Sequence, residues 1–216
     1  HYDIAVIDEA QMIADRDRGH SWTRAILGVK ADEIHICMSP AAEEVVTHLI
    51  ALCEDTFEVR HYERKTALVC EQEAFVFPDD VTEGDALITF TKRAVLDIAG
   101  RLEREGIRAS VIYGSLPPEI RRRQIRLFLS HETKVVVSTD AIGMGLNLPV
   151  RRIVFIQTEK YDGISTRPLN IPEIRQIAGR AGRFGMYDTG YVNAMGEDAR
   201  NYIAKRFDPV SYTHLT

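Results

Sequence analysis

Short apolar runs alternate along the chain with longer segments of helical pattern. Seven runs of four to six residues predict strands, at 3–8, 33–38, 86–90, 109–113, 134–138, 152–156 and 191–194. Several are apolar throughout and rich in Ile and Val, which is typical of strands buried on both faces of a parallel sheet. The pattern therefore predicts a sheet built from short, buried strands.

The segments between these strands carry helical patterns. Helices are predicted at 41–52, 92–105, 118–129, 172–181 and 197–205. Pro118 and Pro172 stand where a first-turn proline belongs, since proline at that position loses no hydrogen bond. A chain that repeats strand, helix, strand is expected to be an α/β protein with right-handed crossovers.

One stretch, 54–83, is polar enough to mark a boundary between domains. We place a linker at 57–65 within it. Residues 1–56 then hold too few elements for a domain, whereas 66–208 can form a full-sized one. The tail 209–216 fits no element, and either a disordered end or an artefact of gene assembly explains it.

Charge is divided unevenly along the chain. Residues 1–90 carry 7 Lys and Arg against 19 Asp and Glu, and residues 91–216 carry 20 against 13, so that net charges of −12 and +7 sum to −5. A basic half of this kind can meet a polyanion, although a solvated surface of mixed charge explains it as well. Three widely spaced cysteines and scattered histidines favour buried thiols in a reducing compartment over a metal site.

The opening stretch "YDIAVIDEAQ" ends a strand in two carboxylates. Ligands of α/β sheets bind at the carboxyl ends of strands. Asp8 there could hold a Mg²⁺ ion that binds nucleotide phosphates, and Glu9 could act as the general base toward a water. An Asp that caps the following helix is about equally consistent with this short pattern.

The stretch "QIAGRAGRFG", at 176–185, places Arg180 and Arg183 three residues apart. In a continuous helix they share a face with Gln176 and can reach phosphates together, as arginine fingers do. The small residues Gly179, Ala181 and Gly182 are expected to let the backbone approach a ligand or a facing lobe. A basic surface helix explains the arginines but not these small residues, because glycine destabilises a helix by about 1 kcal/mol.

The stretch "VVVSTDAIGMGLNLP", at 135–149, ends a buried strand in Ser-Thr-Asp and a Gly-x-Gly loop. Hydroxyl and backbone N–H groups at such a place can bind phosphate oxygens. A Gly-x-Gly loop is weak evidence on its own. Its position between a parallel-type strand and the arginine segment strengthens the interpretation.

Taken in order, these stretches resemble the motifs of superfamily-two helicases. "DEAQ" resembles motif II, "MSPAA" at 38–42 stands at motif III, and "LITFTKR" at 87–93 resembles motif IV. "STDAIGMGLN" is similar to motif V and "QIAGRAGR" to motif VI. With "VIYGSLPP" at 111–118, the fuller strings resemble the suppressor-of-var-three type of DExH-box RNA helicase, over about residues 2–195.

The resemblance implies an α/β fold of RecA-like, P-loop NTPase helicase type. Residues 1–56 would be the C-terminal edge of a first lobe, and 66–208 a complete second lobe. ATP and Mg²⁺ would bind at a cleft between the lobes, with Asp8 associated with the metal. The catalytic residues it implies are Asp8, Glu9, Arg180 and Arg183, and the nucleotide-binding residues are Gln11, Gly143, Asn147 and Gln176.

The same resemblance implies movement on single-stranded RNA driven by ATP hydrolysis, in the 3′-to-5′ direction. The matching RNA-binding residues are Ser39, Thr91, Tyr113, Gly114 and Thr139. The segment 160–170 is either a hairpin that touches nucleic acid or an ordinary surface loop. The implied protein is monomeric and not membrane-bound, and has an exoribonuclease as a candidate partner. It would be cytoplasmic if bacterial, the source we favour, and mitochondrial if eukaryotic.

Two departures from the family pattern limit the interpretation. "MSPAA" lacks the Ser-Ala-Thr of many relatives, which puts the coupling role of Ser39 in doubt. The sequence also contains no G-x-x-x-x-G-K-[ST] loop, so we expect a fragment of a longer helicase that is nearly inactive by itself. A DNA helicase of the same superfamily and a non-catalytic RecA-like module that binds RNA or protein remain alternatives.

Overall fold

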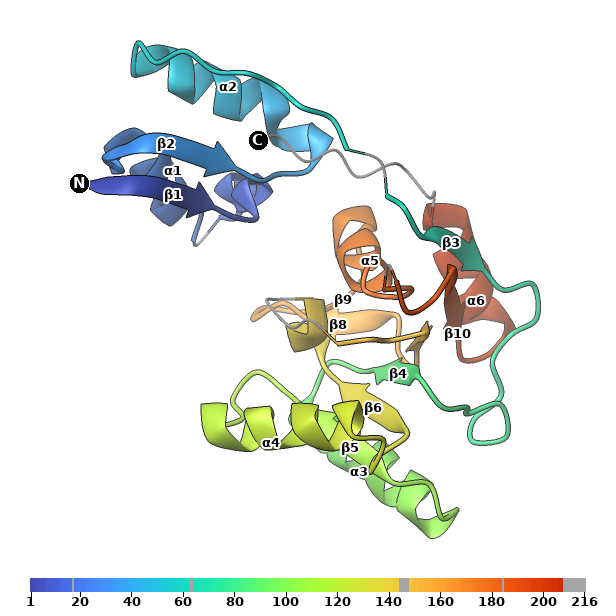
Figure 1. Ribbon diagram of the computed structural model, residues 1–216. Coiled ribbons are helices and arrows are strands. Elements are labelled where there is room, and N and C mark those ends of the chain that lie inside the picture. The colour runs from blue at the N-terminus through green and yellow to red at the C-terminus, as the bar shows by residue number, and fades with distance from the viewer. Residues whose placement is uncertain (17, 63, 144–147, 184, 208–216) are drawn as a thin grey trace. The chain divides into compact units, whose positions relative to one another are not determined.

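The computed structural model describes residues 1–16, 18–62, 64–143, 148–183 and 185–207 (Figure 1). The chain divides into two compact units, residues 1–64 and residues 65–209. The division falls inside the segment where the sequence predicts a linker, and the described part of 57–65 contains neither helix nor strand. Each unit is described by itself below.

Unit 1 contains a two-stranded parallel sheet and short helices (Figure 1). Its elements are strand β1 (Tyr2–Ile7), 3₁₀ helix η1 (Ala10–Ala14), helix α1 (Gly19–Gly28), strand β2 (Ala31–Ile36), 3₁₀ helix η2 (Pro40–Ala42) and helix α2 (Glu43–Leu52). Helix α1 was not among the predicted elements, because His, Ser, Trp and Thr in its first turns are weak helix formers. It begins at Gly19, where a Cβ atom would collide with the carbonyl of Ile13.

The core of unit 1 lies on one side of strand β1. Ile7, Ile26, Ile36 and Val46 pack together there with Met38. On the opposite side of β1 the apolar side chains are exposed, with Tyr2 at 68%, Ile4 at 59% and Val6 at 64%. The prediction that the apolar runs form strands buried on both faces is therefore wrong for β1, because no helix of the described residues covers this face.

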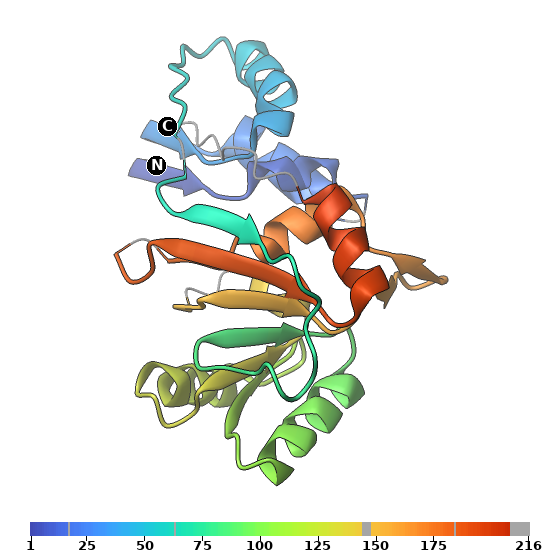
Figure 2. The ribbon, with the colours of Figure 1, turned by 90° about the vertical axis from the view of Figure 1, so that its right-hand side faces the viewer.

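Unit 2 is built on a six-stranded sheet in which every pairing is parallel. Its strands are β3 (Ala67–Cys70), β4 (Asp85–Ile88), β5 (Ala109–Ile112), β6 (Val135–Ser138), β7 (Arg152–Phe155) and β10 (Thr189–Ala194), in the order β3-β10-β7-β4-β6-β5. Figure 2 shows β3, β10, β7 and β4 side by side. The predicted α/β fold class is confirmed.

Helices cover both faces of this sheet. They are α3 (Lys92–Arg104), α4 (Pro118–Leu129), α5 (Ile171–Ala178) and α6 (Glu197–Arg206). Alternate residues along each strand face opposite sides, so Leu87 and Val137 pack with α3 whereas Ile88 and Val136 pack with α4, α5 and α6. Two apolar layers thus hold the sheet rigidly between them.

The carboxyl edge of the sheet carries the connections that matter for function. From β4 the chain runs to the edge strand β5, whereas from β6, next to β4, it runs the other way to β7. Neighbouring strands whose connections run in opposite directions along the sheet usually form the ligand crevice of an α/β fold. The 3₁₀ helix η3 (Asp140–Gly143) follows β6, and an antiparallel hairpin of β8 (Glu159–Tyr161) and β9 (Thr166–Pro168) follows β7.

The three cysteines were predicted to be buried, and the structure does not bear this out. Cys37, Cys53 and Cys70 are all half-exposed, free thiols. In the described part of the chain, no group of three or more His, Cys, Asp or Glu side chains is arranged to hold a metal ion. No helix in the described ranges is both long and apolar enough to span a membrane.

Candidate nucleotide and nucleic-acid sites

The two carboxylates of the DEAQ segment stand at the carboxyl end of β1. Asp8 is exposed, and its Oδ1 accepts a hydrogen bond of 2.8 Å from the backbone N–H of Glu9. The indole N–H of Trp22 on α1 donates to the backbone carbonyl of Asp8 at 2.9 Å. These bonds fix the backbone at the strand end while the Asp8 carboxylate faces solvent.

Glu9 adopts a backbone conformation that is rare for residues other than glycine. Its φ of 55° and ψ of 39° lie in the left-handed region, where a Cβ atom is disfavoured. Strained backbone of this kind is found most often at functional sites, where the surrounding structure enforces it. At Glu9 the strain turns the chain abruptly from β1 into η1, so that the Glu9 side chain remains beside the strand end.

Gln11 connects this turn to the segment at motif III. Its amide nitrogen donates to Glu9 Oε2, and its amide oxygen accepts a 3.1 Å bond from the backbone N–H of Ser39. The link was not predicted, because a sequence does not show which distant backbone group an amide will meet. Gln11 therefore links the candidate catalytic carboxylate of Glu9 to the backbone of Ser39 within unit 1.

These residues fit a Mg-nucleotide in their chemistry. Carboxylate oxygens are preferred Mg²⁺ ligands, and such sites use one or two carboxylates together with water and substrate phosphates. Asp8 offers an exposed carboxylate that matches this role. Burial raises the pKa of the nearby Cys37 thiol, and the negative charge of Asp8 raises it further, so Cys37 favours the neutral form beside the carboxylate.

The arginine segment of motif VI is not helical, contrary to prediction. Helix α5 ends at Ala178, so Arg180 and Arg183 follow it in a loop and share no helix face with Gln176. Gly182 has a φ of +72°, and a Cβ atom there would lie 2.5 Å from the backbone nitrogen of Gly190 on β10. A backbone this close to another strand cannot continue a helix, and only glycine fits there.

This close approach also corrects the role given to the small residues. Ala181 is buried, and Gly182 donates its N–H to the carbonyl of Val150 at 2.8 Å. A Cβ on Gly190 would in turn meet the backbone of Ala181 at 2.6 Å. Ala181 and Gly182 therefore pack inside unit 2, against its own sheet, rather than opening a path to a ligand.

The candidate nucleotide residues of unit 2 do lie together. The Arg180 guanidinium donates to the backbone carbonyl of Gly143 at the end of η3. A Cβ on Gly143 would lie 3.5 Å from the side chain of Gln176. Gly143, Gln176 and Arg180 thus form one cluster between η3 and α5. Asn147 lies outside the described residues.

The candidate RNA contacts of unit 2 follow three neighbouring strands at the carboxyl edge. Thr91 follows β4, Thr139 follows β6, and Tyr113 and Gly114 follow β5. Lys92 stands 5.3 Å from the centre of the Tyr113 ring, which connects the β4 and β5 loops. The structure therefore brings these four residues to one edge of the sheet, whereas Ser39 belongs to unit 1.

The two threonines among these residues also have local structural tasks. Thr91 caps α3, because its hydroxyl accepts a 3.1 Å bond from the N–H of Ala94. Thr139 is buried and its hydroxyl accepts from the N–H of Ala141 at 3.3 Å. Gly114 is exposed and has open space around it, so its backbone is accessible to a ligand.

Two models of protein families match the sequence of this chain. Residues 1–62 match the DEXQ-box helicase domain of Suv3, and residues 65–185 match the helicase conserved C-terminal domain. The chain belongs to the helicases that carry this conserved C-terminal domain, and its residues 1–62 are similar to the Suv3 type. The glutamine that gives the DEXQ box its name corresponds to Gln11, which joins Glu9 to Ser39 in this structure.

Curated relatives agree with this assignment along most of the chain. A mitochondrial DExH-box ATP-dependent RNA helicase of Arabidopsis thaliana, DExH18, is 42% identical over 94% of this chain and 27% of its own length. The Oryza sativa mitochondrial helicase SUV3 is 42% identical over 91% of this chain and 35% of its own length. The chain thus spans about a third or less of these Suv3-type relatives.

Solved structures share the fold at low identity. Saccharomyces cerevisiae Dbp5 bound to RNA and ADP BeF₃ matches with a TM-score of 0.62 and 19% identity, over 96% of this chain and 58% of that one. A variant of Dbp5 in the same complex matches with a TM-score of 0.64. These likenesses confirm the RecA-like helicase fold of the chain.

Several polar residues support the sites of this helicase chain and were not predicted. Arg121 on α4 donates to the carbonyl of Gly114 at 2.9 Å, and the buried hydroxyl of Thr89 donates to Gln157 after β7 at 2.6 Å. Lys160 and Glu173 join the hairpin to α5. A sequence signal existed for Glu173 alone, since "NIPE" at 170–173 is an N-terminal helix pattern with a capping glutamate.

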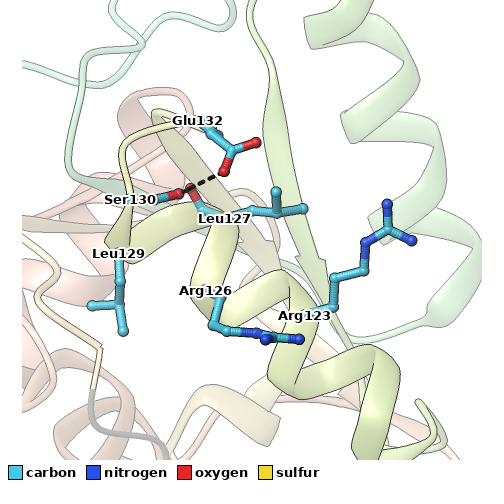
Figure 3. Close-up of a pocket in the computed structure, with 6 residues that line it drawn as sticks. All are labelled: Arg123, Arg126, Leu127, Leu129, Ser130 and Glu132. Carbon is cyan, nitrogen blue, oxygen red and sulfur yellow. Dashed lines mark hydrogen bonds between the residues drawn. The ribbon is translucent and has the colours of Figure 1, made fainter.

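A hollow of about 530 Å³ lies at the end of α4 (Figure 3). Arg123, Arg126, Leu127, Leu129, Ser130 and Glu132 line it. The Ser130 hydroxyl donates a 3.0 Å hydrogen bond to Glu132, which Figure 3 draws as a dashed line. None of the candidate site residues of this chain lines the hollow, so it is separate from the nucleotide and RNA clusters.

Proposed function

We propose that the protein containing this chain is an ATP-dependent RNA helicase that couples ATP hydrolysis to movement on single-stranded RNA. The observation that carries the proposal is the 42% identity, over 94% of the chain, to a protein named as a mitochondrial ATP-dependent RNA helicase. The chain spans only about a quarter of that relative. The activity is therefore proposed for the whole protein, and the chain alone is expected to be nearly inactive.

We assign the hydrolytic chemistry to Asp8 and Glu9. Bound Mg²⁺ neutralises phosphate charge and orients the phosphates of ATP. Asp8 would hold this ion through its exposed carboxylate. Glu9 would accept the proton of the attacking water, and the Gln11 amide bonded to Glu9 would keep that carboxylate in place.

We propose that Arg180 and Arg183 stabilise the negative charge that develops on the phosphates in the transition state. Arginine delocalises its charge over a planar group that matches phosphate geometry. In this arrangement Gly143, Asn147 and Gln176 would contact the nucleotide. The bond between Arg180 and the Gly143 carbonyl supports the proposal, because it holds the guanidinium next to the backbone of motif V.

We assign RNA binding to the carboxyl edge of unit 2, through Thr91, Tyr113, Gly114 and Thr139, and to Ser39 in unit 1. Contacts to phosphates and sugars would bind RNA without strong sequence preference. The turn of the β8–β9 hairpin, at 162–165, is a further candidate contact. We also propose a monomer with 3′-to-5′ polarity, an exoribonuclease partner, and a mitochondrial location in a eukaryote or a cytoplasmic one in a bacterium.

The test is ATP turnover of the full-length protein with and without single-stranded RNA. Glu9→Gln should reduce RNA-stimulated turnover by about 100-fold or more, because it removes the general base without changing side-chain size. Glu44→Gln is a matched control, since Glu44 is an exposed glutamate in the first turn of α2. Unchanged turnover in Glu9→Gln would contradict the proposed mechanism.

Two further outcomes distinguish the alternatives. A DNA helicase of the same superfamily would unwind a DNA duplex with a single-stranded overhang better than the matching RNA duplex. A non-catalytic binding module would bind RNA with no ATP turnover in the wild-type protein. The paired carboxylates and the arginine cluster argue against such a module, because binding alone requires neither.

A further inference from the structure

The hairpin that follows β7 is joined to two candidate sites by ion pairs. Lys160 on β8 places its ammonium group 3.0 Å from Asp140 Oδ2 and 3.1 Å from Glu173 Oε1. Asp140 is the first residue of η3, directly after Thr139, and Glu173 lies in the first turn of α5. One lysine thus bridges the segment of motif V and the helix of motif VI.

Glu173 is held from several directions. Arg167 on β9 donates two hydrogen bonds of 2.9 Å to its two carboxylate oxygens. The N–H of Asn170 donates to the same carboxylate at 2.9 Å, which completes a capping box at the start of α5. Burial alone would raise the pKa of Glu173, but the bonds from Arg167, Asn170 and Lys160 outweigh it and lower that pKa to about 2.

A second contact joins the same two elements at their other ends. Arg180, just after α5, donates to the carbonyl of Gly143, the last residue of η3. Gln176, near the end of α5, packs closely over Gly143. Helix η3 is therefore fastened to α5 at both ends, through Lys160 at its start and through Arg180 at its end.

The contacts of Lys160 and Arg180 connect residues that are assigned to two different ligands, RNA and the nucleotide. Thr139, next to Asp140, is a candidate RNA contact, whereas Gln176 and Arg180 are candidate nucleotide contacts. The side chains of Lys160 and Glu173 are only 21% and 19% exposed, so water screens their attraction less than that of a surface pair. A displacement of the RNA-side segment would therefore be transmitted to α5.

We propose that Lys160 and Glu173 are positioning residues that couple RNA contact at motif V to the nucleotide contacts at motif VI, by making η3 and α5 move as one body. The inference rests on the proposed function. It predicts that loss of the Lys160 bridge uncouples RNA from hydrolysis, because Asp140 is released from α5 while Arg180 still holds Gly143.

The experiment measures ATP turnover of the full-length helicase with and without saturating single-stranded RNA. Lys160→Met removes the ammonium group and keeps the apolar stem, and should reduce the stimulation by RNA about tenfold while basal turnover changes by less than about twofold. Lys160→Arg should restore most of the stimulation, because a guanidinium can also bridge two carboxylates. Arg167→Met is the matched control, since Arg167 joins the hairpin to Glu173 but does not contact Asp140.

A second measurement does not depend on turnover. Amide hydrogen exchange of the 216-residue chain reports the bonds from Ile142 N–H to Thr139 and from Ile174 N–H to Asn170, which lie in η3 and α5. Lys160→Met should speed exchange at Ile142 and Ile174, whereas Arg167→Met should leave Ile142 unchanged. If Lys160→Met does not fold, Asp140→Asn removes the same ion pair and takes its place.

Five results would overturn the inference. Stimulation by RNA that is unchanged in Lys160→Met, or that falls equally in Arg167→Met, would show that the bridge does not couple the sites. Equal losses of basal and stimulated turnover would show a purely structural role. A wild-type protein without RNA-stimulated turnover would contradict the proposed function and this inference with it, whereas unchanged exchange at Ile142 would contradict the inference alone.

Discussion

Strands β1 and β6 have similar sequences and opposite surroundings. Both are apolar runs that end in polar residues at a candidate site, "IAVIDE" in unit 1 and "VVVSTD" in unit 2. In β6, Val135, Val136 and Val137 are all at most 1% exposed, whereas in β1 Ile4 and Val6 are 59% and 64% exposed. The same sequence pattern thus accompanies both a central strand and a half-covered one.

The difference arises from what surrounds each strand. β6 pairs with β4 and β5, and helices cover both of its faces. Within the described residues, β1 pairs with β2 alone, and its apolar neighbours lie on one side. An apolar run therefore predicts a strand, but its burial depends on layers that the run itself does not encode. The sites differ accordingly, since hydrogen bonds around Gln11 support the DEAQ turn whereas packed layers support the edge of unit 2.

Ion pairs provide the largest expected contrast between the units. In unit 2, Arg152 bonds to Asp85 at 2.7 Å, with Arg152 nearly and Asp85 wholly buried. Burial raises the pKa of Asp85, although the bond from Arg152 opposes this effect. Arg152→Met should lower the free energy of unfolding by about 3–5 kcal/mol, because it leaves a buried carboxylate unpaired. Urea unfolding followed by circular dichroism measures this loss.

The matching change in unit 1 removes an exposed ion pair. Arg60 bonds to Glu58 at 3.0 Å with both side chains largely in solvent, so Arg60→Met should lower the free energy of unfolding far less than Arg152→Met does. The single tryptophan, Trp22, lies in α1, so its fluorescence reports unfolding of unit 1. Equal losses of stability in the two variants would show that burial does not increase the contribution of an ion pair.

Truncation of apolar side chains should show the same contrast between the two units, with smaller losses of stability. Ile153 on β7 is wholly buried, and Ile153→Ala should lower the free energy of unfolding by about 3 kcal/mol, through lost burial and the cavity left behind. Ile4→Ala on β1 should change it by less than about 1 kcal/mol, because Ile4 already contacts water. Urea midpoints of both variants test the difference. A large loss in Ile4→Ala would show that β1 is covered in solution.

The sequence predicts much of the fold for a physical reason. Strand β6 is a continuous apolar run because both of its faces are buried. Helix α3 buries Val95, Ile98 and Leu102 on one face, which gives it a pattern with a period near 3.6. Helix α1 and strand β3 lack such clear patterns, so the sequence predicted no definite range for either. The end of α5 was placed too late, because arginine spacing alone does not show that Gly182 lies against Gly190.

Only those residues of the site that lie together in one short stretch of sequence could be predicted. Asp8, Glu9 and the motif V hydroxyls were found because their place after an apolar strand defines a sheet edge. The Gln11–Ser39 bond and the Lys160 bridge join residues 28 and 13 or more positions apart. Such pairings depend on how elements pack, and no single stretch of sequence states them.

Glycine substitutions test the corrected geometry of the arginine segment. Gly182→Ala should destabilise unit 2 by about 2–3 kcal/mol, because a Cβ combines left-handed strain with a collision against Gly190. Gly185→Ala is the matched control, since Gly185 has a φ of +81° but open space around it, and should cost about 1 kcal/mol. Thermal unfolding by circular dichroism compares the two. Equal losses would show that the contact with Gly190 adds nothing.

The smallest effect is expected from acid titration of Glu173. Its pKa of about 2 in the folded chain lies below its ordinary value of 4.5, so its stabilising effect is present above about pH 4.5 and is lost as pH falls toward 2. Lys160 on β8, Arg167 on β9 and the Asn170 N–H face the carboxylate, with Asp140 across Lys160. Partial exposure reduces the expected contribution to about 1–2 kcal/mol at neutral pH.

Glu173→Gln removes this titration while keeping the shape of the side chain. The melting temperature of the variant should lie below that of the wild type at pH 7, and the two should approach each other as pH falls from about 4.5 toward 3, because Glu173 then gains its proton in the unfolded chain while it stays ionised in the folded one. Glu119→Gln, in the exposed first turn of α4, is the control and should show no such convergence. A difference between wild type and Glu173→Gln that stays constant from pH 7 to 3 would show that the charge of Glu173 does not stabilise the hairpin and α5.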